Sequence, residues 1–347
     1  MIDYEALLRM PPFGMAQHDK DAFYKDAIVE LSEHHIAHCE NYYRLYRGGY
    51  PGMPLPVRLF KLYELMSIPR EAVKKTMTSS GTTGQAVSRI YLDAESATRQ
   101  TRVLAAIVTD FVGKERRPML ILDSSAVIKD RRMFSARGAG ILGFSMFGRG
   151  SQYALDESME LNVPLLEEFS AKYADTPILL FGFTFMVWQY VIEQLKDRNL
   201  HLHLHGTLIH GGGWKKLASL SISNERFKKE VQEWLGIETV LNYYGMVEQT
   251  GSIFMECPCG RLHASIFSDV DIIDPITMEK KKSGRGLMQC TSLLPTSYPG
   301  HVLLTEDEGE IIGIDDCPCG RLGKTFMIHG RVAGAEIRGC SDTYEKH

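Results

Sequence analysis

The sequence predicts an α/β fold in which parallel strands flanked by helices are followed by a β-rich closing subdomain. Two observations predict it. Between residues 94 and 245, helical and strand-like segments alternate, which is typical of a parallel sheet with helices on its faces. From about residue 252, short strand-like segments separated by glycine, proline and charge replace this alternation. We therefore expect an α/β core over residues 1–251, a β-rich subdomain over 252–330 and a flexible tail over 331–347.

The expected elements follow from side-chain periodicity. One or two amphipathic helices are predicted within residues 19–46, where apolar side chains recur three to five positions apart. A proline-rich stretch at 48–60 ends this pattern. The segments that follow are helix 94–113, strand 118–123, helix 165–174, strand 176–182, helix 185–197, strand 202–213, helix 224–236 and strand 237–245.

Composition narrows the class of protein. With 44% hydrophobic and 24% charged residues, the chain of 347 residues is typical of a globular protein with a large core. A net charge of −4 argues against nucleic acid as a partner. The most apolar run, residues 178–188, is shorter than the roughly 20 residues of a membrane-spanning helix, so membrane insertion is not expected. The first ten residues lack the features of a signal peptide, and we expect a cytoplasmic protein whose seven cysteines are thiols or metal ligands.

The stretch TMTSSGTTGQ, residues 76–85, combines six hydroxyl side chains with two glycines. Glycines let the backbone approach a ligand closely, and hydroxyls with exposed N–H groups suit phosphate oxygens. The Walker-type loop requires a lysine after its last glycine, whereas Gln85 and Ala86 follow Gly84 here. The sequence therefore predicts a phosphate-binding loop made of hydroxyls and amides.

The hexapeptide CPCGRL occurs twice, at 257–262 and 317–322. Four thiolates complete a tetrahedral zinc shell, so we predict a structural zinc site; the alternative is four buried reduced cysteines. His263 is a reserve ligand. The four predicted ligands are Cys257, Cys259, Cys317 and Cys319.

A third stretch, LNYYGMVEQTG at 241–251, places a strand before a turn at Gly245. Ligands of α/β proteins bind at the carboxyl ends of strands. Tyr244 is suited to stacking on a purine, and Glu248 to holding Mg²⁺ beside phosphates.

Together the loop at 78–84 and the motif at 242–248 resemble the signatures of the adenylate-forming ligase superfamily, which includes acyl-CoA synthetases, adenylation domains and luciferase. Val247 stands where that superfamily usually has threonine. The resemblance implies ATP and Mg²⁺ as cofactors, and a fold like the N-terminal domain of those ligases without the usual mobile C-terminal domain. It implies nucleotide-binding roles for Thr78, Ser79, Ser80, Gly81, Thr82, Thr83, Gly84, Gly211, Gly212, Gly213, Asn242, Tyr244, Gly245, Asp307 and Arg331.

Within that superfamily the chain is similar to the acyl-protein synthetases of the LuxE type. The features that carry this are YGMVEQ, HGGGWKK, the early end of the chain and a cysteine near it, Cys340. The resemblance implies that a carboxylic acid, expected to be a long-chain fatty acid, becomes acyl-AMP, then a thioester on Cys340, and then passes to an acyl reductase partner. Glu248 and Cys340 would be catalytic, and Phe183, Trp214 and Lys215 would contact substrate.

Two other functions stay open at this point. The acyl or aryl group would pass to CoA or a carrier protein in the first, and in the second the chain would be a non-catalytic nucleotide-binding scaffold. The lysine that the mobile domain supplies in the superfamily has no counterpart in the sequence, and Lys215 is the candidate for its role. An oligomer is compatible with the sequence.

Overall fold

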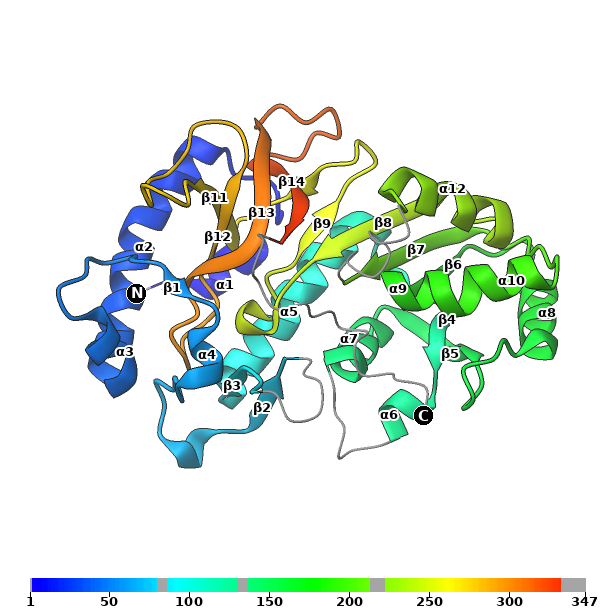
Figure 1. Ribbon diagram of the computed structural model, residues 1–347, viewed down its shortest axis with the longest axis horizontal. Helices are drawn as coiled ribbons and strands as arrows, with labels where there is room; N and C mark the ends of the chain where they lie inside the picture. The colour runs from blue at the N-terminus through cyan, green and yellow to red at the C-terminus, as the bar shows by residue number, and fades with distance from the viewer. Residues whose placement is uncertain (1, 80–85, 130–135, 213–221, 332–347) are drawn as a thin grey trace. The chain divides into compact units, whose positions relative to one another are not determined.

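The computed structural model describes residues 2–79, 86–129, 136–212 and 222–331, which form two compact units (Figure 1). Of the described residues, the first unit contains 2–79, 86–111 and 244–331, and the second contains 112–129, 136–212 and 222–243. The domain boundaries expected from the sequence, after residues 251 and 330, mark changes in composition, whereas the two units are defined by their compactness. Those boundaries therefore stay a prediction.

The second unit is built on a parallel sheet, as the alternating segments predict. Its strand order is β8-β7-β6-β4-β5, and each neighbouring pair is parallel. All six residues of β6 are buried, because a parallel sheet covered on both faces requires strands that are apolar on both sides. The strands are β4 (Arg117–Ser124), β5 (Gly148–Leu155), β6 (Ile178–Phe183), β7 (Gly206–Gly211) and β8 (Thr239–Tyr244), whose last residue belongs to the first unit.

Helices alternate with these strands and begin and end at recognisable signals. In α12 (Asn224–Leu235), the Ser223 hydroxyl accepts a hydrogen bond from the Arg226 amide, and Gly236 ends the helix with a φ of 80°. The buried face of α12 repeats at the helical spacing through Phe227 and Val231. The other helices of the unit are α6 (Ala126–Lys129), α7 (Ala136–Ser145), α8 (Val163–Lys172), α9 (Thr184–Met186), a π-helical segment η3 (Val187–Ile192) and α10 (Glu193–Asp197).

The first unit contains an antiparallel sheet of order β11-β12-β13-β14-β10-β9, with β1 parallel to β13 at its side. Every residue from Ser252 to Arg331 is described, and the regular elements in this range are strands, which confirms the β-rich character predicted there. The strands are β1 (Leu55–Pro56), β9 (Phe254–Glu256), β10 (Leu262–His263), β11 (Ser268–Ile273), β12 (Gly286–Ser292), β13 (Val302–Ile314) and β14 (Lys324–Arg331).

Helices complete the first unit, and two of them, spanning Gln17–His38 and Glu40–Tyr46, lie where one or two helices are predicted within residues 19–46. A two-stranded hairpin of β2 (Lys75–Thr78) and β3 (Arg89–Leu92) belongs to the same unit. The helices are α1 (Tyr4–Arg9), α2 (Gln17–His38), α3 (Glu40–Tyr46), α4 (Leu59–Leu62), η1 (Arg70–Ala72), α5 (Ala94–Val112) and η4 (Val247–Gln249).

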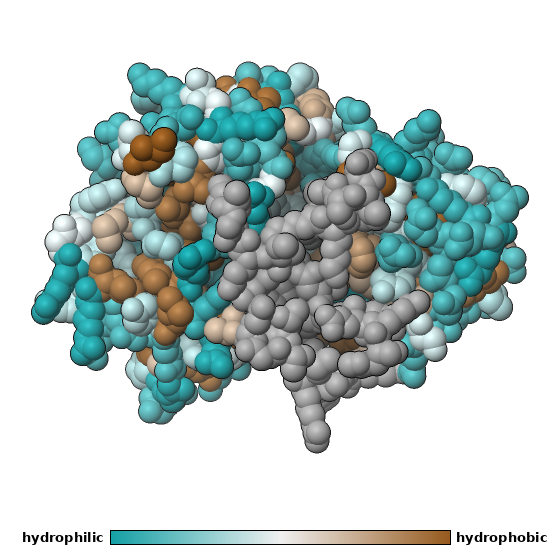
Figure 2. Space-filling view, in the orientation of Figure 1, coloured by the Kyte–Doolittle hydropathy of each residue, from teal (hydrophilic) through white to brown (hydrophobic). Residues whose placement is uncertain are grey.

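The outer surface carries scattered apolar side chains. Polar residues predominate on the face drawn in Figure 2, and apolar residues lie there in several separate groups. Tyr50, Leu62 and Ile276 are among the exposed ones. In the described part of the chain, each helix is too short or too polar to serve as a membrane span.

Candidate functional site

The predicted phosphate-binding loop connects the two strands of the β2–β3 hairpin. Thr78 lies opposite Arg89 at the end of the hairpin. The next pair closes the base of the loop, because the Ser79 amide donates to the Ser88 carbonyl at 3.1 Å and the Ser88 amide donates to Oγ of Ser79 at 2.9 Å. A two-strand anchor of this kind fixes both ends of the loop that carries the hydroxyls.

The turn that carries Glu248 packs against this hairpin within the first unit. Val247 and Met77 both pack against a buried cluster that includes Ile90, and Met77 and Ile90 lie on the two hairpin strands. Oγ1 of Thr250 lies 3.8 Å from Sδ of Met77. Two segments that are about 170 residues apart in sequence are therefore neighbours, as the two motifs predict.

Glu248 is buried, with 6% of its surface exposed. Burial raises the pKa of its carboxyl group above the usual value, because a charged carboxylate loses hydration there. The Ser88 hydroxyl and the positive charges of Lys61 and Arg331 act in the opposite direction. A buried carboxylate beside Ser88, at the base of the predicted loop, is suited to holding a divalent cation, whose charge would replace the lost hydration.

Tyr244, Asp307 and Arg331 form a chain of polar contacts in the first unit. The Tyr244 hydroxyl donates to Oδ2 of Asp307 at 2.7 Å, and Nε of Arg331 donates to Oδ1 at 3.1 Å. Asp307 and Arg331 face each other across the β13–β14 pair. Burial and the Asp307 carboxylate raise the pKa of Tyr244 well above its usual value, so the phenol is a hydrogen-bond donor near neutral pH.

The glycine-rich segment lies in the second unit, where β7 ends at Gly211 beside β8. A Cβ atom at Gly211 would lie 2.2 Å from the ring of Tyr243, so only glycine permits this approach. Asn242 pairs in register with His210 across the two strands. Gly212 follows with a φ of 95°, a conformation that favours glycine. The predicted residues Gly211, Gly212 and Asn242 thus share the carboxyl end of the parallel sheet.

Phe183 ends the neighbouring strand, β6, and is only 2% exposed. Its ring approaches Gly140 so closely that a Cβ there would lie 2.7 Å from Cζ. The ring of Phe181 stacks on that of Phe144 with their centroids 4.4 Å apart, and the ring centroid of Tyr243 lies 4.9 Å from that of Phe144. These aromatic rings give the carboxyl end of the sheet an apolar character.

Three of the four predicted zinc ligands come together in the first unit. The ligand atoms of Cys257, Cys317, Cys319 and His263 all lie within 4.8 Å of one another. Cys259 is exposed and does not belong to this group. The reserve ligand His263 takes the fourth place in its stead, because Cys259 points outward from its turn while His263 is fully buried on β10.

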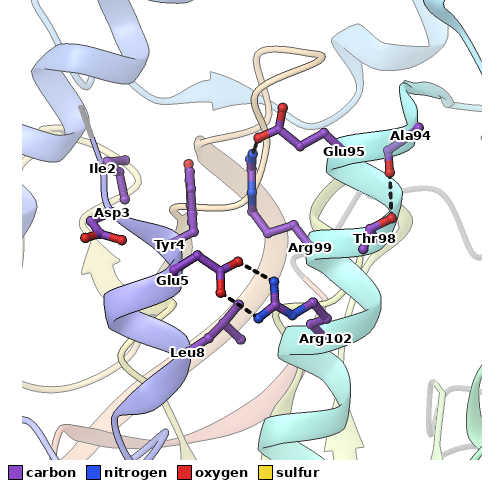
Figure 3. Close-up of a pocket in the computed structure, with 10 residues that line it drawn as sticks. All are labelled: Ile2, Asp3, Tyr4, Glu5, Leu8, Ala94, Glu95, Thr98, Arg99 and Arg102. Carbon is purple, nitrogen blue, oxygen red and sulfur yellow. Dashed lines mark hydrogen bonds and ion pairs between the residues drawn. The ribbon is translucent and has the colours of Figure 1, made fainter.

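A separate surface pocket lies between α1 and α5 (Figure 3). Its cations are already engaged: Arg102 binds both oxygens of Glu5, while Arg99 binds Glu95 and lies 3.7 Å from the Tyr4 ring. No residue predicted for nucleotide or substrate lines it.

Several predicted residues lie outside the described part of the chain: Ser80, Gly81, Thr82, Thr83, Gly84, Gly213, Trp214, Lys215 and Cys340. Ser88 is a residue that the sequence reasoning missed. It escaped because it stands three residues beyond the stretch at 76–85, and its pairing with Ser79 depends on the register of the hairpin.

Solved structures share this fold. A 2-hydroxyisobutyryl-CoA ligase in complex with 2-HIB-AMP and CoA matches with a TM-score of 0.70 and 16% identity over 95% of this chain and 73% of that one. The same ligase in its postadenylation state, in complex with 2-HIB-AMP, matches with a TM-score of 0.69 and 14% identity over 92% of this chain and 69% of that one. An anthranilate CoA ligase in complex with anthranoyl-AMP matches with a TM-score of 0.51 and 14% identity over 78% of this chain and 49% of that one.

These matches establish the fold of adenylate-forming ligases for this chain, as the resemblance of its motifs predicts. Among curated proteins the comparison gives no significant match. The family model of LuxE, an acyl-protein synthetase, matches residues 2–347. The chain therefore belongs to the LuxE acyl-protein synthetase family.

Proposed function

We propose that this protein activates a carboxylic acid with ATP and Mg²⁺, forming acyl-AMP, and then carries the acyl group as a thioester on Cys340. The acid is proposed to be a long-chain fatty acid, and the final acceptor an acyl reductase. The observation that carries the first step is the packing of the Glu248 turn against the β2–β3 hairpin. It brings a buried carboxylate to the base of a loop of hydroxyls and glycines.

In the first step a carboxylate oxygen of the acid attacks the α-phosphorus of ATP, and pyrophosphate leaves. Two groups of this chain are assigned to that step. The loop hydroxyls and amides would bind the departing phosphates, and Glu248 would hold Mg²⁺ next to them. Asp307 would accept hydrogen bonds from the ribose hydroxyls, and the hydrogen bond of 3.1 Å from Nε of Arg331 supports this by fixing the orientation of its carboxylate.

The second step transfers the acyl group to sulfur. The Cys340 thiolate attacks the acyl carbonyl, and AMP leaves with the electrons of the broken C–O bond. The aromatic residues near Phe183 support an apolar acid as the substrate. Trp214 and Lys215 are proposed as further substrate contacts, and Lys215 as the cation that balances the reacting carboxylate.

Two assays test this scheme in order. ATP–pyrophosphate exchange, run with Mg²⁺ and a panel of fatty and aromatic acids, measures the first step. We expect exchange to depend on the acid and to fall at least about 100-fold in Glu248→Gln, which keeps the shape of the side chain but loses its charge. Exchange that persists in Glu248→Gln would remove Glu248 from the mechanism.

Labelled acid then tests the thioester. We expect label on the polypeptide that hydroxylamine releases, with label lost in Cys340→Ala and retained in Cys259→Ala, which removes an exposed cysteine instead. Exchange should persist in both variants. Exchange without label on the wild-type chain would favour the second candidate, in which CoA or a carrier protein receives the group, as the CoA-bound ligase of the same fold suggests. Absence of both activities would leave a nucleotide-binding scaffold.

A further inference from the structure

We propose that Cys257, His263, Cys317 and Cys319 bind one zinc ion in a closed tetrahedral site. Their ligand atoms all lie within 4.8 Å of one another. The site is separate from the residues assigned to nucleotide. Ile314 pairs with Lys324 next to the cysteine turn, while Asp307 pairs with Arg331 seven residues farther along β13. At about 3.3 Å per residue, roughly 23 Å of strand separates the two.

Two of the distances between the ligand atoms match those that zinc imposes. Bonds of about 2.3 Å to sulfur and about 2.0 Å to nitrogen, at tetrahedral angles, place two sulfurs about 3.8 Å apart and a sulfur and a nitrogen about 3.5 Å apart. Sγ of Cys257 lies 3.7 Å from Sγ of Cys317, and Sγ of Cys319 lies 3.4 Å from Nε2 of His263. A disulfide would require sulfurs about 2.05 Å apart. Each pair is therefore spaced as two corners of one coordination shell.

The two cysteine turns have the same backbone form. The Gly260 amide donates to the Cys257 carbonyl at 2.9 Å, and the Gly320 amide donates to the Cys317 carbonyl at 3.0 Å. Both glycines have positive φ, 76° and 82°, which a residue with a side chain adopts only at a cost.

The repeated hexapeptide therefore forms a repeated turn, and each copy contributes its first cysteine, Cys257 or Cys317, to the group of ligand atoms. A turn repeated in this way is expected of a metal site and not of unrelated core cysteines.

The ligand set differs between the two copies of CPCG. The second copy supplies both of its cysteines, whereas the first supplies only Cys257, because Cys259 is exposed. His263, with no exposed surface, completes the set from β10. Three thiolates and one imidazole are a common structural zinc shell, and they leave no position open for water or substrate. The ion would fasten the turn after β9 to the turn between β13 and β14.

Metal content and ligand type test the proposal on the full chain without any substrate, so the outcome is independent of the proposed function. We expect about one equivalent of zinc per chain after purification, and an X-ray absorption spectrum that fits three sulfurs and one nitrogen. Cobalt(II) in place of zinc should give the visible spectrum of a tetrahedral thiolate site. A chain that holds no zinc and takes up neither zinc nor cobalt would overturn the proposal, as would iron as the native metal.

Two variants of the same repeat separate ligand from bystander. Cys259→Ser should retain one equivalent of zinc and the cobalt spectrum, whereas Cys317→Ser should lose most of the metal. If Cys317→Ser does not fold, the comparison of wild type with Cys259→Ser still decides the ligand set. Loss of zinc from Cys259→Ser, or an absorption spectrum that fits four sulfurs, would overturn the assignment of His263.

Discussion

Tyr244 donates its phenolic hydrogen to Asp307 at 2.7 Å, although the two residues are 63 positions apart in sequence. The bond joins the last residue of β8 to the middle of β13, where Arg331 engages the other carboxylate oxygen. Asp307 is therefore held from both sides. Its carboxylate keeps one orientation, and the lone pairs that these two donors leave open are the ones a ligand hydroxyl could use.

Removing the Asp307 carboxylate is predicted to weaken ATP binding strongly. A hydrogen bond to a charged group contributes about 1.5–3 kcal/mol, so Asp307→Ala should raise the Kd for ATP by roughly 10- to 150-fold. Tyr244→Phe removes only the hydroxyl that orients Asp307 and keeps the aromatic face, so we expect a smaller rise, less than about tenfold. Isothermal titration calorimetry with ATP and Mg²⁺ measures both.

Glu308→Ala serves as the matched control, because Glu308 follows Asp307 on β13 and strand alternation directs it to the opposite face. Its Kd for ATP should stay close to that of the wild type. An equal loss of affinity in Glu308→Ala and Asp307→Ala would indicate a general effect on the strand rather than a contact with ribose.

Local patterns are enough to predict much of this fold. The helices, the parallel strands and the β-rich part are encoded in side-chain periods, and α12 shows why: Ser223 and Gly236 mark its ends within the segment itself. The two nucleotide motifs can be paired from the sequence alone, because both resemble signatures of one superfamily. The packing of the Glu248 turn on the β2–β3 hairpin agrees with that pairing.

Sequence reasoning fails where the outcome depends on which way a side chain points. Cys257 and Cys259 stand in one hexapeptide, and nothing local indicates that the first turns inward and the second outward. The backbone decides it, since β10 runs back beside β9 and brings His263 to the position that Cys259 leaves. Ser88 was missed for a similar reason, because its role as the partner of Ser79 arises from hairpin register.

The buried carboxylate of Asp269 is predicted to be essential for stability. It lies 3.2 Å from Nζ of Lys20 and 2.8 Å from Nζ of Lys324, and the Lys20 side chain is 1% exposed. Asp269→Asn leaves Lys20 buried without its counter-charge, so the free energy of unfolding should fall by about 3–5 kcal/mol in urea titrations. Adding Lys20→Met to that variant should recover part of the loss, because it removes the unpaired charge. A loss below about 1 kcal/mol in Asp269→Asn would contradict this account.

Buried histidines are predicted to make the protein less stable in mild acid. Burial lowers the pKa of His301 and of His210 to about 3, and lowers that of His35 well below its usual value. Below about pH 6.5 the unfolded chain binds protons at these histidines while the folded chain does not, so stability falls as the pH drops toward 3. Each histidine adds a slope of up to about 1.4 kcal/mol per pH unit. Between about pH 7 and pH 4, the free energy of unfolding measured in urea should therefore fall less steeply in His301→Gln than in wild type. His18→Gln is the control, because it changes a side chain that is 95% exposed, and it should leave that slope unchanged.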